Sequence, residues 1–293
     1  MRRAAGFLAA AAAVLLHAAC SRGERPVRVG SKNFTEPVVL GEIAAQSLEK
    51  AGVKVERRLD LGGSFLCHQA LVSGELDLYP EYSGTALLAI LKEKPDTDAA
   101  KVYARVASEY ARRWSLVWAP PLGFENTFAL VMRGDEAKRL GIGKISDLAG
   151  HPDLRPGFGY EFVERADGFA GLSNAYGLRF AARPAEMDLG LLYPALAQGR
   201  VDVVAGNSTD GLIAAMRLAV LDDDRRYFPP YQAAFVVRGP VWNDARVRRA
   251  IESLSGTISG DAMRSMNAAV DRDGRRPGAV GAEFLAERAR RHQ

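Results

Sequence analysis

The sequence has few of the residues and motifs on which most catalytic and metal sites depend. Only two cysteines and four histidines occur in 293 residues, and His68 and His151 have no partner at the spacing of metal ligands. There is no P-loop, no G-x-S-x-G and no H-E-x-x-H motif, and the GFGYEF segment at 157–162 has no third glycine for a dinucleotide fingerprint. These absences predict a protein that is not an enzyme and that holds neither a metal nor a cofactor.

Long blocks of charge of one sign are also missing. The formal net charge is +4, and the basic excess lies largely in scattered arginines near the C-terminus, in the segments RVRR, GRR and ERARR. Such arginines are typical of solvated helix faces, and no aromatic RNA-binding run or recognition helix accompanies them. We therefore expect no nucleic-acid partner.

The N-terminus carries an apolar run that is too short to span a bilayer. Arg2 and Arg3 precede the run from Ala4 to Leu16, whereas a membrane span needs about 20 residues. This layout predicts a signal peptide at 1–19 and an exported, periplasmic or other extracytoplasmic protein.

The run ends in LLHAAC, which resembles a bacterial lipobox and predicts a lipid anchor on Cys20, followed by a polar tether at 20–26. His17 stands where such boxes usually carry an aliphatic residue, so release of a free periplasmic form is the alternative. If Cys20 is acylated, Cys67 has no disulfide partner, and its place on an apolar helix stripe indicates core packing.

The chain then alternates between strand and helix patterns. Strands are expected at 26–31, 53–61 and 75–80, with amphipathic helices at 36–52 and 64–74 between them. This order predicts an α/β fold with a parallel sheet, whose ligands bind in the loops at the carboxyl ends of the strands.

A weak internal repeat indicates two such units. ALVSGELDL at 70–78 and ALAQGRVDV at 195–203 share a helix end, a capping glycine and a strand, and the same offset places Tyr82 on Asn207. We expect two similar α/β lobes across a cleft, lobe 1 at 27–128 plus 232–293 and lobe 2 at 129–231. A chance match of common helix-end residues is the alternative.

Several loop motifs carry a family resemblance. VGSKNFTE, LGGSF, LDLYPEYSGTAL, GFENTFAL, STDG and YFPPYQA, in this order, resemble the substrate-binding proteins of ABC transporters for glycine betaine, choline, carnitine and related osmoprotectants. The resemblance covers Val27 to about Leu285. It implies the type II periplasmic-binding-protein fold, with two lobes joined by two crossovers. It also implies a receptor that binds a quaternary-ammonium or zwitterionic solute and delivers it to ABC permease and ATPase subunits.

The resemblance also assigns residues to the cleft. A trimethylammonium group has no N–H to donate, so aromatic faces must hold it, while a ligand carboxylate needs cationic or N–H donors. Tyr82 and Tyr231 match cage tyrosines, and Lys32 and Arg165 match positions that hold the carboxylate. The full set expected to bind ligand is Lys32, Tyr82, Thr85, Asn126, Phe128, Tyr160, Arg165, Asn207 and Tyr231.

Two cage positions depart from the family pattern. Phe128 keeps a ring without the hydroxyl, and Asn207 has no ring, although Tyr160 or Phe162 could replace it. The departure at Asn207 leaves open a different small zwitterion, such as an amino-acid betaine, as the ligand. Tyr79, by contrast, is expected to be structural because it packs at the end of its own strand.

Overall fold

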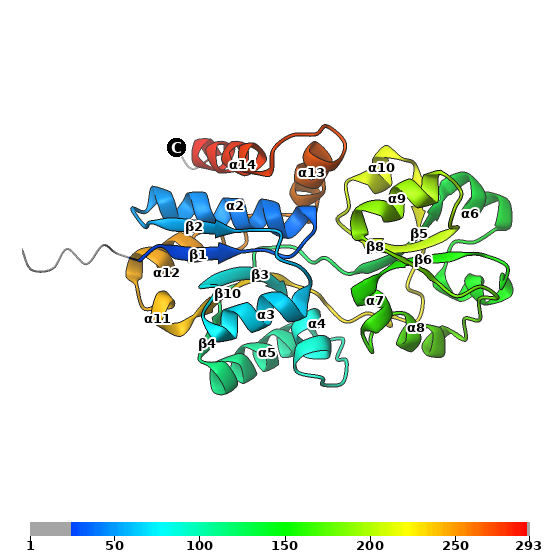
Figure 1. The fold of residues 1–293 in the computed structure, drawn as a ribbon, viewed down its shortest axis with the longest axis horizontal. Helices are drawn as coiled ribbons and strands as arrows, with labels where there is room; N and C mark the ends of the chain where they lie inside the picture. The colour runs from blue at the N-terminus through cyan, green and yellow to red at the C-terminus, as the bar shows by residue number, and fades with distance from the viewer. Residues whose placement is uncertain (1–24, 292–293) are drawn as a thin grey trace, which may run out of the picture.

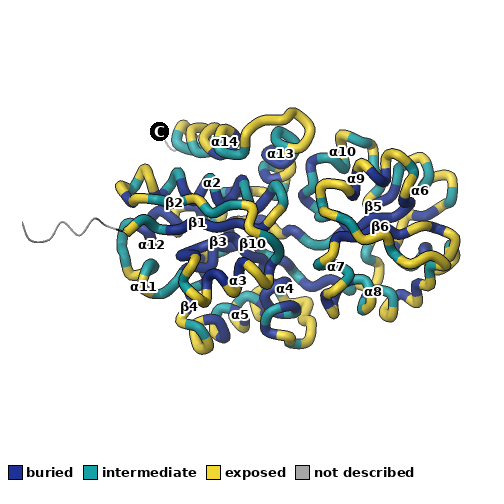
Figure 2. Tube along the Cα trace, in the orientation of Figure 1, coloured by how far each residue is buried: buried dark blue, intermediate teal, exposed yellow. Residues whose placement is uncertain are grey.

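Two five-stranded sheets form the centres of two lobes (Figure 1). The structure is a computed structural model that describes residues 25–291, so the predicted signal peptide and Cys20 lie outside the described residues. The strand order is β2-β1-β3-β10-β4 in lobe 1 and β7-β6-β8-β5-β9 in lobe 2. In both lobes helices cover the two faces of the sheet, and the central strands β3 and β8 are largely buried, whereas β2, β7 and β9 are partly exposed (Figure 2).

The sheet of lobe 1 is mixed. Strand β1 pairs in parallel with β2 and β3, and β10 lies antiparallel between β3 and β4. Its strands are β1 (Val27–Gly30), β2 (Val55–Arg58), β3 (Leu78–Tyr82), β4 (Leu116–Trp118) and β10 (Ala233–Arg238). Its helices are α2 (Thr35–Lys50), α3 (Ser64–Ser73), α4 (Ser83–Thr85), the π-helix η1 (Ala86–Ile90), α5 (Ala99–Trp114), α11 (Gly239–Trp242), α12 (Ala245–Glu252), α13 (Gly260–Asp271) and α14 (Pro277–Arg291).

The sheet of lobe 2 repeats this arrangement. Strand β6 pairs in parallel with β7 and β8, and β5 lies antiparallel between β8 and β9. The strands are β5 (Phe128–Arg133), β6 (Pro156–Gly159), β7 (Ala185–Met187), β8 (Val203–Asn207) and β9 (Leu218–Val220). The helical segments are α6 (Gly134–Leu140), η2 (Ile145–Gly150), α7 (Tyr160–Glu164), α8 (Phe169–Tyr176), α9 (Leu189–Ala197) and α10 (Leu212–Ala215).

The internal repeat corresponds to this shared topology. Strands β3 and β8, which end the two copies of the sequence pattern, are both the central strand of their sheet. The repeat pattern predicted that Gly74 caps a helix. Gly74 does end α3, and its φ of 79° is the left-handed conformation typical of a capping glycine. The predicted two-lobed α/β fold is confirmed, and the parallel part of the first sheet follows the predicted strand and helix order.

The lobes are joined by two crossover segments, at 119–127 and 221–232, that run side by side. Glu125 and Gln232 form an antiparallel bridge, and the N–H of Asn126 donates to the carbonyl of Tyr231 at 3.1 Å. Because β5 begins at Phe128, the second sheet starts one residue before the expected lobe boundary.

Cys67, the one cysteine among residues 25–291, is fully buried on α3, where its thiol faces the carbonyl of Ser31, in agreement with the predicted packing role. Burial raises the pKa of this thiol to about 12. Within residues 25–291, no helix combines the length and the apolar character needed to cross a bilayer.

Candidate functional site

A cavity of about 60 Å³ lies between the lobes, where the loops after β1, β3, β6 and β8 converge. These loops follow the carboxyl ends of parallel strands, which is where open α/β sheets bind ligands. Both lobes and both crossovers contribute side chains. The lining residues are Lys32, Asn33, Phe34, Ser64, Tyr82, Thr85, Asn126, Phe128, Glu161, Phe162, Arg165, Leu189, Ala205, Asn207 and Tyr231.

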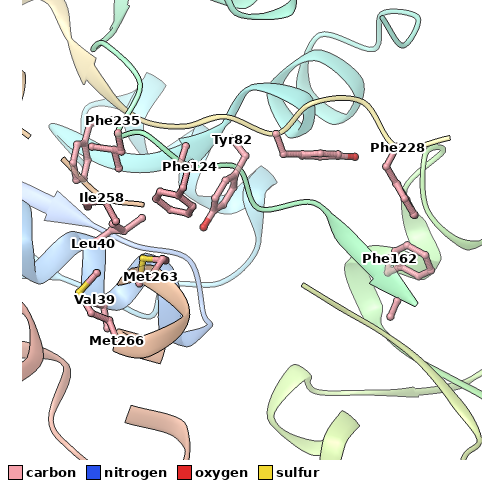
Figure 3. Close-up of a cluster of buried hydrophobic side chains, with 14 of the residues drawn as sticks. Val39, Leu40, Tyr82, Phe124, Phe162, Phe228, Phe235, Ile258, Met263 and Met266 are labelled. Atoms are coloured by element: carbon pink, nitrogen blue, oxygen red, sulfur yellow. The ribbon is translucent and has the colours of Figure 1, made fainter. Parts of the chain in front are cut away.

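Five of the lining residues carry aromatic rings. Phe34 and Tyr82 are stacked in lobe 1, with ring centroids 6.4 Å apart. The Phe128 ring lies 4.9 Å from Phe162 and 6.1 Å from Tyr231, in both cases edge to face. In Figure 3, Tyr82 and Phe162 approach the space between the lobes from opposite sides. The cavity therefore presents several electron-rich ring faces to anything bound inside it.

Two buried cations lie beside these rings, and each is paired with a carboxylate of its own lobe. The ammonium of Lys32 donates to Glu81 and stands 4.7 Å from the centroid of the Tyr82 ring. The guanidinium of Arg165 donates to both oxygens of Asp167 and stands 5.1 Å from the centroid of Phe128. The pairing offsets the cost of burying these charges.

Thr85 and Tyr231 complete the surroundings of Arg165. The Thr85 hydroxyl accepts a long hydrogen bond from Arg165 Nη1 at 3.4 Å, and the Tyr231 hydroxyl donates to Asp167 at 3.1 Å. Arg165 and Asp167 belong to lobe 2, Thr85 belongs to lobe 1, and Tyr231 lies in the second crossover. This cluster therefore connects both lobes along one wall of the cavity.

Glu36 holds side chains of a second wall of the cavity in place through hydrogen bonds. It lies in the first turn of α2 and accepts hydrogen bonds from the Tyr82 hydroxyl at 2.7 Å and from Asn126 Nδ2 at 2.8 Å. Asn267 Nδ2 donates to the other carboxylate oxygen at 3.1 Å. Burial raises the pKa of Glu36. Burial and then the neighbouring Glu36 raise the pKa of Tyr82 well above its ordinary value, so its hydroxyl stays protonated and fixes the orientation of the ring.

The loops of the two lobes touch on either side of the cavity. The N–H of Ser64, at the start of α3, donates to Glu161 of α7 at 3.3 Å, and Asn267 of α13 donates to the carbonyl of Thr209 at 2.9 Å. Together with the Arg165–Thr85 contact, these bonds close the lobes over the cavity.

Asn207 lines the cavity at the end of β8, the position equivalent to Tyr82 in lobe 1. Its side chain and its backbone N–H both donate to Asp210, at 3.4 and 2.8 Å, and Tyr193 donates to the same carboxylate at 2.6 Å. Burial raises the pKa of Asp210 to about 6. A polar amide thus occupies the place of the ring, and Phe162 of α7 supplies a ring elsewhere on the lobe 2 side.

The structure brings eight of the nine residues predicted to bind ligand into this cavity. Tyr160 is the exception, because its side chain is 52 % exposed and lies in a neighbouring groove with Phe65 and Leu66. Phe34, which is not among the residues predicted to bind ligand, also lines the cavity and stacks on Tyr82. Its place in the SKNFTE loop, directly after the first strand, was the signal that could have identified it.

Within residues 25–291, no three His, Cys, Asp or Glu side chains are grouped so that they could hold a metal ion. The arrangement offers ring faces and hydrogen-bond donors to a bound solute.

Comparisons with known proteins agree with this site. The family model described as "Substrate binding domain of ABC-type glycine betaine transport system" matches residues 25–287. The chain is 36 % identical to a glycine-betaine-binding protein of Pseudomonas aeruginosa, over 98 % of this chain and 95 % of that protein. It is 32 % identical to the carnitine transport binding protein OpuCC of Listeria monocytogenes, over 88 % and 85 % of the two chains.

A third relative is longer. The chain is 33 % identical to the ergothioneine transport permease/ergothioneine binding protein EgtU of Helicobacter pylori, and the match covers 95 % of this chain and 50 % of that protein. Among solved structures, the crystal structure of a glycine betaine/carnitine/choline ABC transporter has a TM-score of 0.72 at 32 % identity, covering 89 % of this chain and 98 % of that one. This protein therefore belongs to the family of substrate-binding domains of ABC-type glycine betaine transport systems, which bind a solute for transport and are not enzymes.

Proposed function

We propose that this receptor binds a zwitterionic quaternary-ammonium osmoprotectant, such as glycine betaine, in the cavity between its lobes and delivers it to an ABC permease. The observation that carries the proposal is the pairing of five aromatic rings with two buried cations around one small cavity. A quaternary ammonium can be held only by dispersion and by ring faces, each worth about 0.5 to 2 kcal/mol.

The ligand carboxylate would be held by Lys32 and Arg165. An ammonium has three N–H donors and a guanidinium has five, so each group keeps free donors after pairing with its own carboxylate. Glu81 and Asp167 neutralise the two cations, and Glu161 adds a further carboxylate to the lining, 3.6 Å from Arg165. The remaining donors of Lys32 and Arg165 favour a ligand that has a carboxylate over choline, which has none.

Calorimetry with a ligand panel tests the proposal. We expect glycine betaine or carnitine to bind, and we expect glycine, which has the same carboxylate without the methyl groups, to give no heat at millimolar concentration. Choline, ergothioneine and common amino acids complete the panel. If another solute binds while no quaternary ammonium does, the ligand assignment is wrong and membership of the family is unaffected.

We also propose that the mature chain is extracytoplasmic and is held to a membrane by acylation of Cys20. The sequence LLHAAC supports this reading, although His17 departs from the usual pattern. Mass spectrometry of the protein extracted from membranes should find an acylated N-terminal cysteine. Cys20→Ala should abolish the modification, whereas Cys67→Ala, a change in the core, should not.

A further inference from the structure

A groove on the surface of lobe 1, remote from the ligand cavity, is lined by cations. It has a volume of about 530 Å³ and lies between α2, α12 and α14, of which α12 and α14 both pack on α2. Its charged lining residues are Lys50, Arg246, Arg249 and Arg288, and the lining includes no Asp or Glu. The groove therefore has a positive surface that the binding of the transported solute does not use.

Neutralisation of helix ends explains only part of this charge. Three helices present their C-terminal turns here, and cations are favourable beside the partial negative charge of such ends. Arg246 forms an ion pair with Asp244 at 2.6 Å and donates to the carbonyl of Gly52 at 3.5 Å, and Arg288 donates to the carbonyl of Ser253. Both arginines therefore have a structural role.

Lys50 and Arg249 stand in the last turns of α2 and α12, where a cation is favourable, but neither side chain donates to a helix-end carbonyl. Both side chains are exposed, and neither makes a hydrogen bond or an ion pair with any residue in the described part of the chain. The Nε of Arg288 is also buried without a hydrogen-bond partner among residues 25–291. Donors that remain unused in a groove free of carboxylates indicate a site for an anionic group.

The groove lies at the end of the molecule where the chain enters lobe 1. The N–H of Val27, the first residue of β1, donates to the carbonyl of Lys54 at 2.8 Å, directly after the end of α2. Figure 1 shows the start of β1 beside α12 and the C-terminal end of α2. Six residues separate Cys20 from Val27, and fully extended they span at most about 25 Å.

We propose that this basic groove binds the headgroups of anionic phospholipids and seats the receptor on its membrane by the end of lobe 1. The inference rests on the proposed anchor at Cys20, because a short tether keeps this end, rather than lobe 2, close to the bilayer. Basic residues at an anionic surface contribute on the order of 1 kcal/mol each, and the attraction extends only about 8 Å at physiological salt. A tether of at most about 25 Å allows the groove to come within that distance of the bilayer.

Vesicle sedimentation with a protein that has no acyl group tests the proposal. The mature chain, residues 20–293 with Cys20→Ser, is mixed with phosphatidylglycerol/phosphatidylcholine vesicles and with phosphatidylcholine vesicles. We expect binding to the anionic vesicles only, and we expect it to weaken as salt rises. The double variant Lys50→Glu/Arg249→Glu should lower the partition coefficient by at least about tenfold.

A matched control separates the groove from net charge. Arg179→Glu/Arg183→Glu makes the same charge change at exposed sites of lobe 2 and should keep vesicle binding close to the original value. Equal loss in both variants, or no binding to anionic vesicles, overturns the proposal. Displacement by millimolar inorganic phosphate at constant ionic strength would identify a site for a soluble anion and also overturns it. The milder Lys50→Gln/Arg249→Gln pair repeats the test if the reversal variant does not fold.

Calorimetry with glycine betaine on the same proteins keeps this inference separate from the proposed function. If a variant loses vesicle binding and still binds the solute, the result bears only on the proposal for the groove. If the protein binds vesicles and does not bind the solute, the result bears only on the proposed function of the cavity.

Discussion

Tyr79 and Tyr82 illustrate how single positions of one strand divide between structure and ligand binding. Successive side chains of a strand point to opposite faces, so residues three apart face different sides of the sheet. Tyr79 is fully buried against α3 and α5 and donates to Glu81, whereas Tyr82 faces the cavity and donates to Glu36. The expectation that Tyr79 is structural agrees with this placement.

Replacement of Tyr82 should therefore weaken solute binding. Tyr82→Ala removes a ring face, and we expect calorimetry to report at least about tenfold lower affinity for the cognate solute. Tyr82→Phe keeps the ring and loses only the bond to Glu36, so its effect should be smaller. Tyr79→Phe, the control in the same strand, should leave the affinity unchanged. Unaltered affinity of a folded Tyr82→Ala protein would remove this residue from the site.

His68 should make the fold sensitive to acid. Its ring is buried between Tyr110 and Trp114, and burial lowers its pKa to about 4, against about 6.5 in an unfolded chain. Between pH 6.5 and pH 4 the His68 ring is therefore protonated in the unfolded state and neutral in the folded state. The contribution of the neutral ring to the free energy of unfolding is complete above pH 6.5 and is lost as the pH falls toward 4.

Urea unfolding at pH 7 and pH 4.5 measures this effect. Between pH 7 and pH 4.5, we expect the free energy of unfolding to fall by about 2 kcal/mol more in the wild-type protein than in His68→Phe. His151→Gln, in the segment between η2 and β6, is the control and should behave as the wild type does. An equal fall in the unfolding free energy of His68→Phe would show that His68 is not the source of the acid sensitivity.

Some partnerships of single residues could not be predicted from the sequence. Lys32 and Arg165 line the cavity, but their carboxylate partners Glu81 and Asp167 depend on how β1, β3 and the loop after α7 pack together. The spacing of hydrophobic residues predicts where helices and strands lie, but it does not predict which charged side chains form ion pairs.

At the scale of elements, the strand and helix patterns predicted the first part of lobe 1 closely. The expected helix at 36–52 corresponds to α2, which spans Thr35–Lys50. The expected strand at 75–80 is shifted, because β3 spans Leu78–Tyr82 and includes Pro80. Proline usually marks a strand end. Strand β1 pairs with β3 only at Leu78, so Pro80 lies beyond that ladder and the strand continues along β10.

The first crossover depends on one glycine. Gly123 has φ of 114°, and a Cβ there would lie 2.9 Å from the carbonyl oxygen of Ile258. Gly123→Ala should destabilise the fold by roughly 1 to 3 kcal/mol, because both the backbone and the contact oppose it. Gly143→Ala, where a Cβ meets nothing within 4 Å, should be close to neutral in the same thermal melts. Equal melting temperatures would show that the crossover adapts without strain.

At the scale of the whole molecule, the cavity exists only because two lobes meet. Neither lobe alone supplies both Tyr82 and Arg165, and the repeated topology explains why equivalent loops face each other. The internal repeat predicted this arrangement, but it could not predict the interlobe bonds, one of which joins α13 to the loop after β8. A solute can favour the closed arrangement only through its higher affinity for that state.

Asn267 is placed to contribute to this closure. Its side chain is buried on α13 and donates to both Glu36 of lobe 1 and the carbonyl of Thr209 of lobe 2. In Asn267→Ala the closed state loses the interlobe bond to Thr209. Because a hydrogen bond to a neutral carbonyl is worth about 0.5 to 1.5 kcal/mol, solute affinity should fall roughly two- to tenfold. Small-angle scattering should then require proportionally more solute to reach the compact radius of gyration.

Asn174→Ala, an exposed change on α8, is the matched control and should titrate as the wild type does. Both measurements are made well below the melting temperature of each variant, so that lost stability is not mistaken for lost closure. If Asn267→Ala closes at the same solute concentration as the wild type, the bridge from Glu36 to Thr209 does not stabilise the closed state. Closure would then depend on the contacts of the opposite wall, from Ser64 to Glu161 and from Arg165 to Thr85.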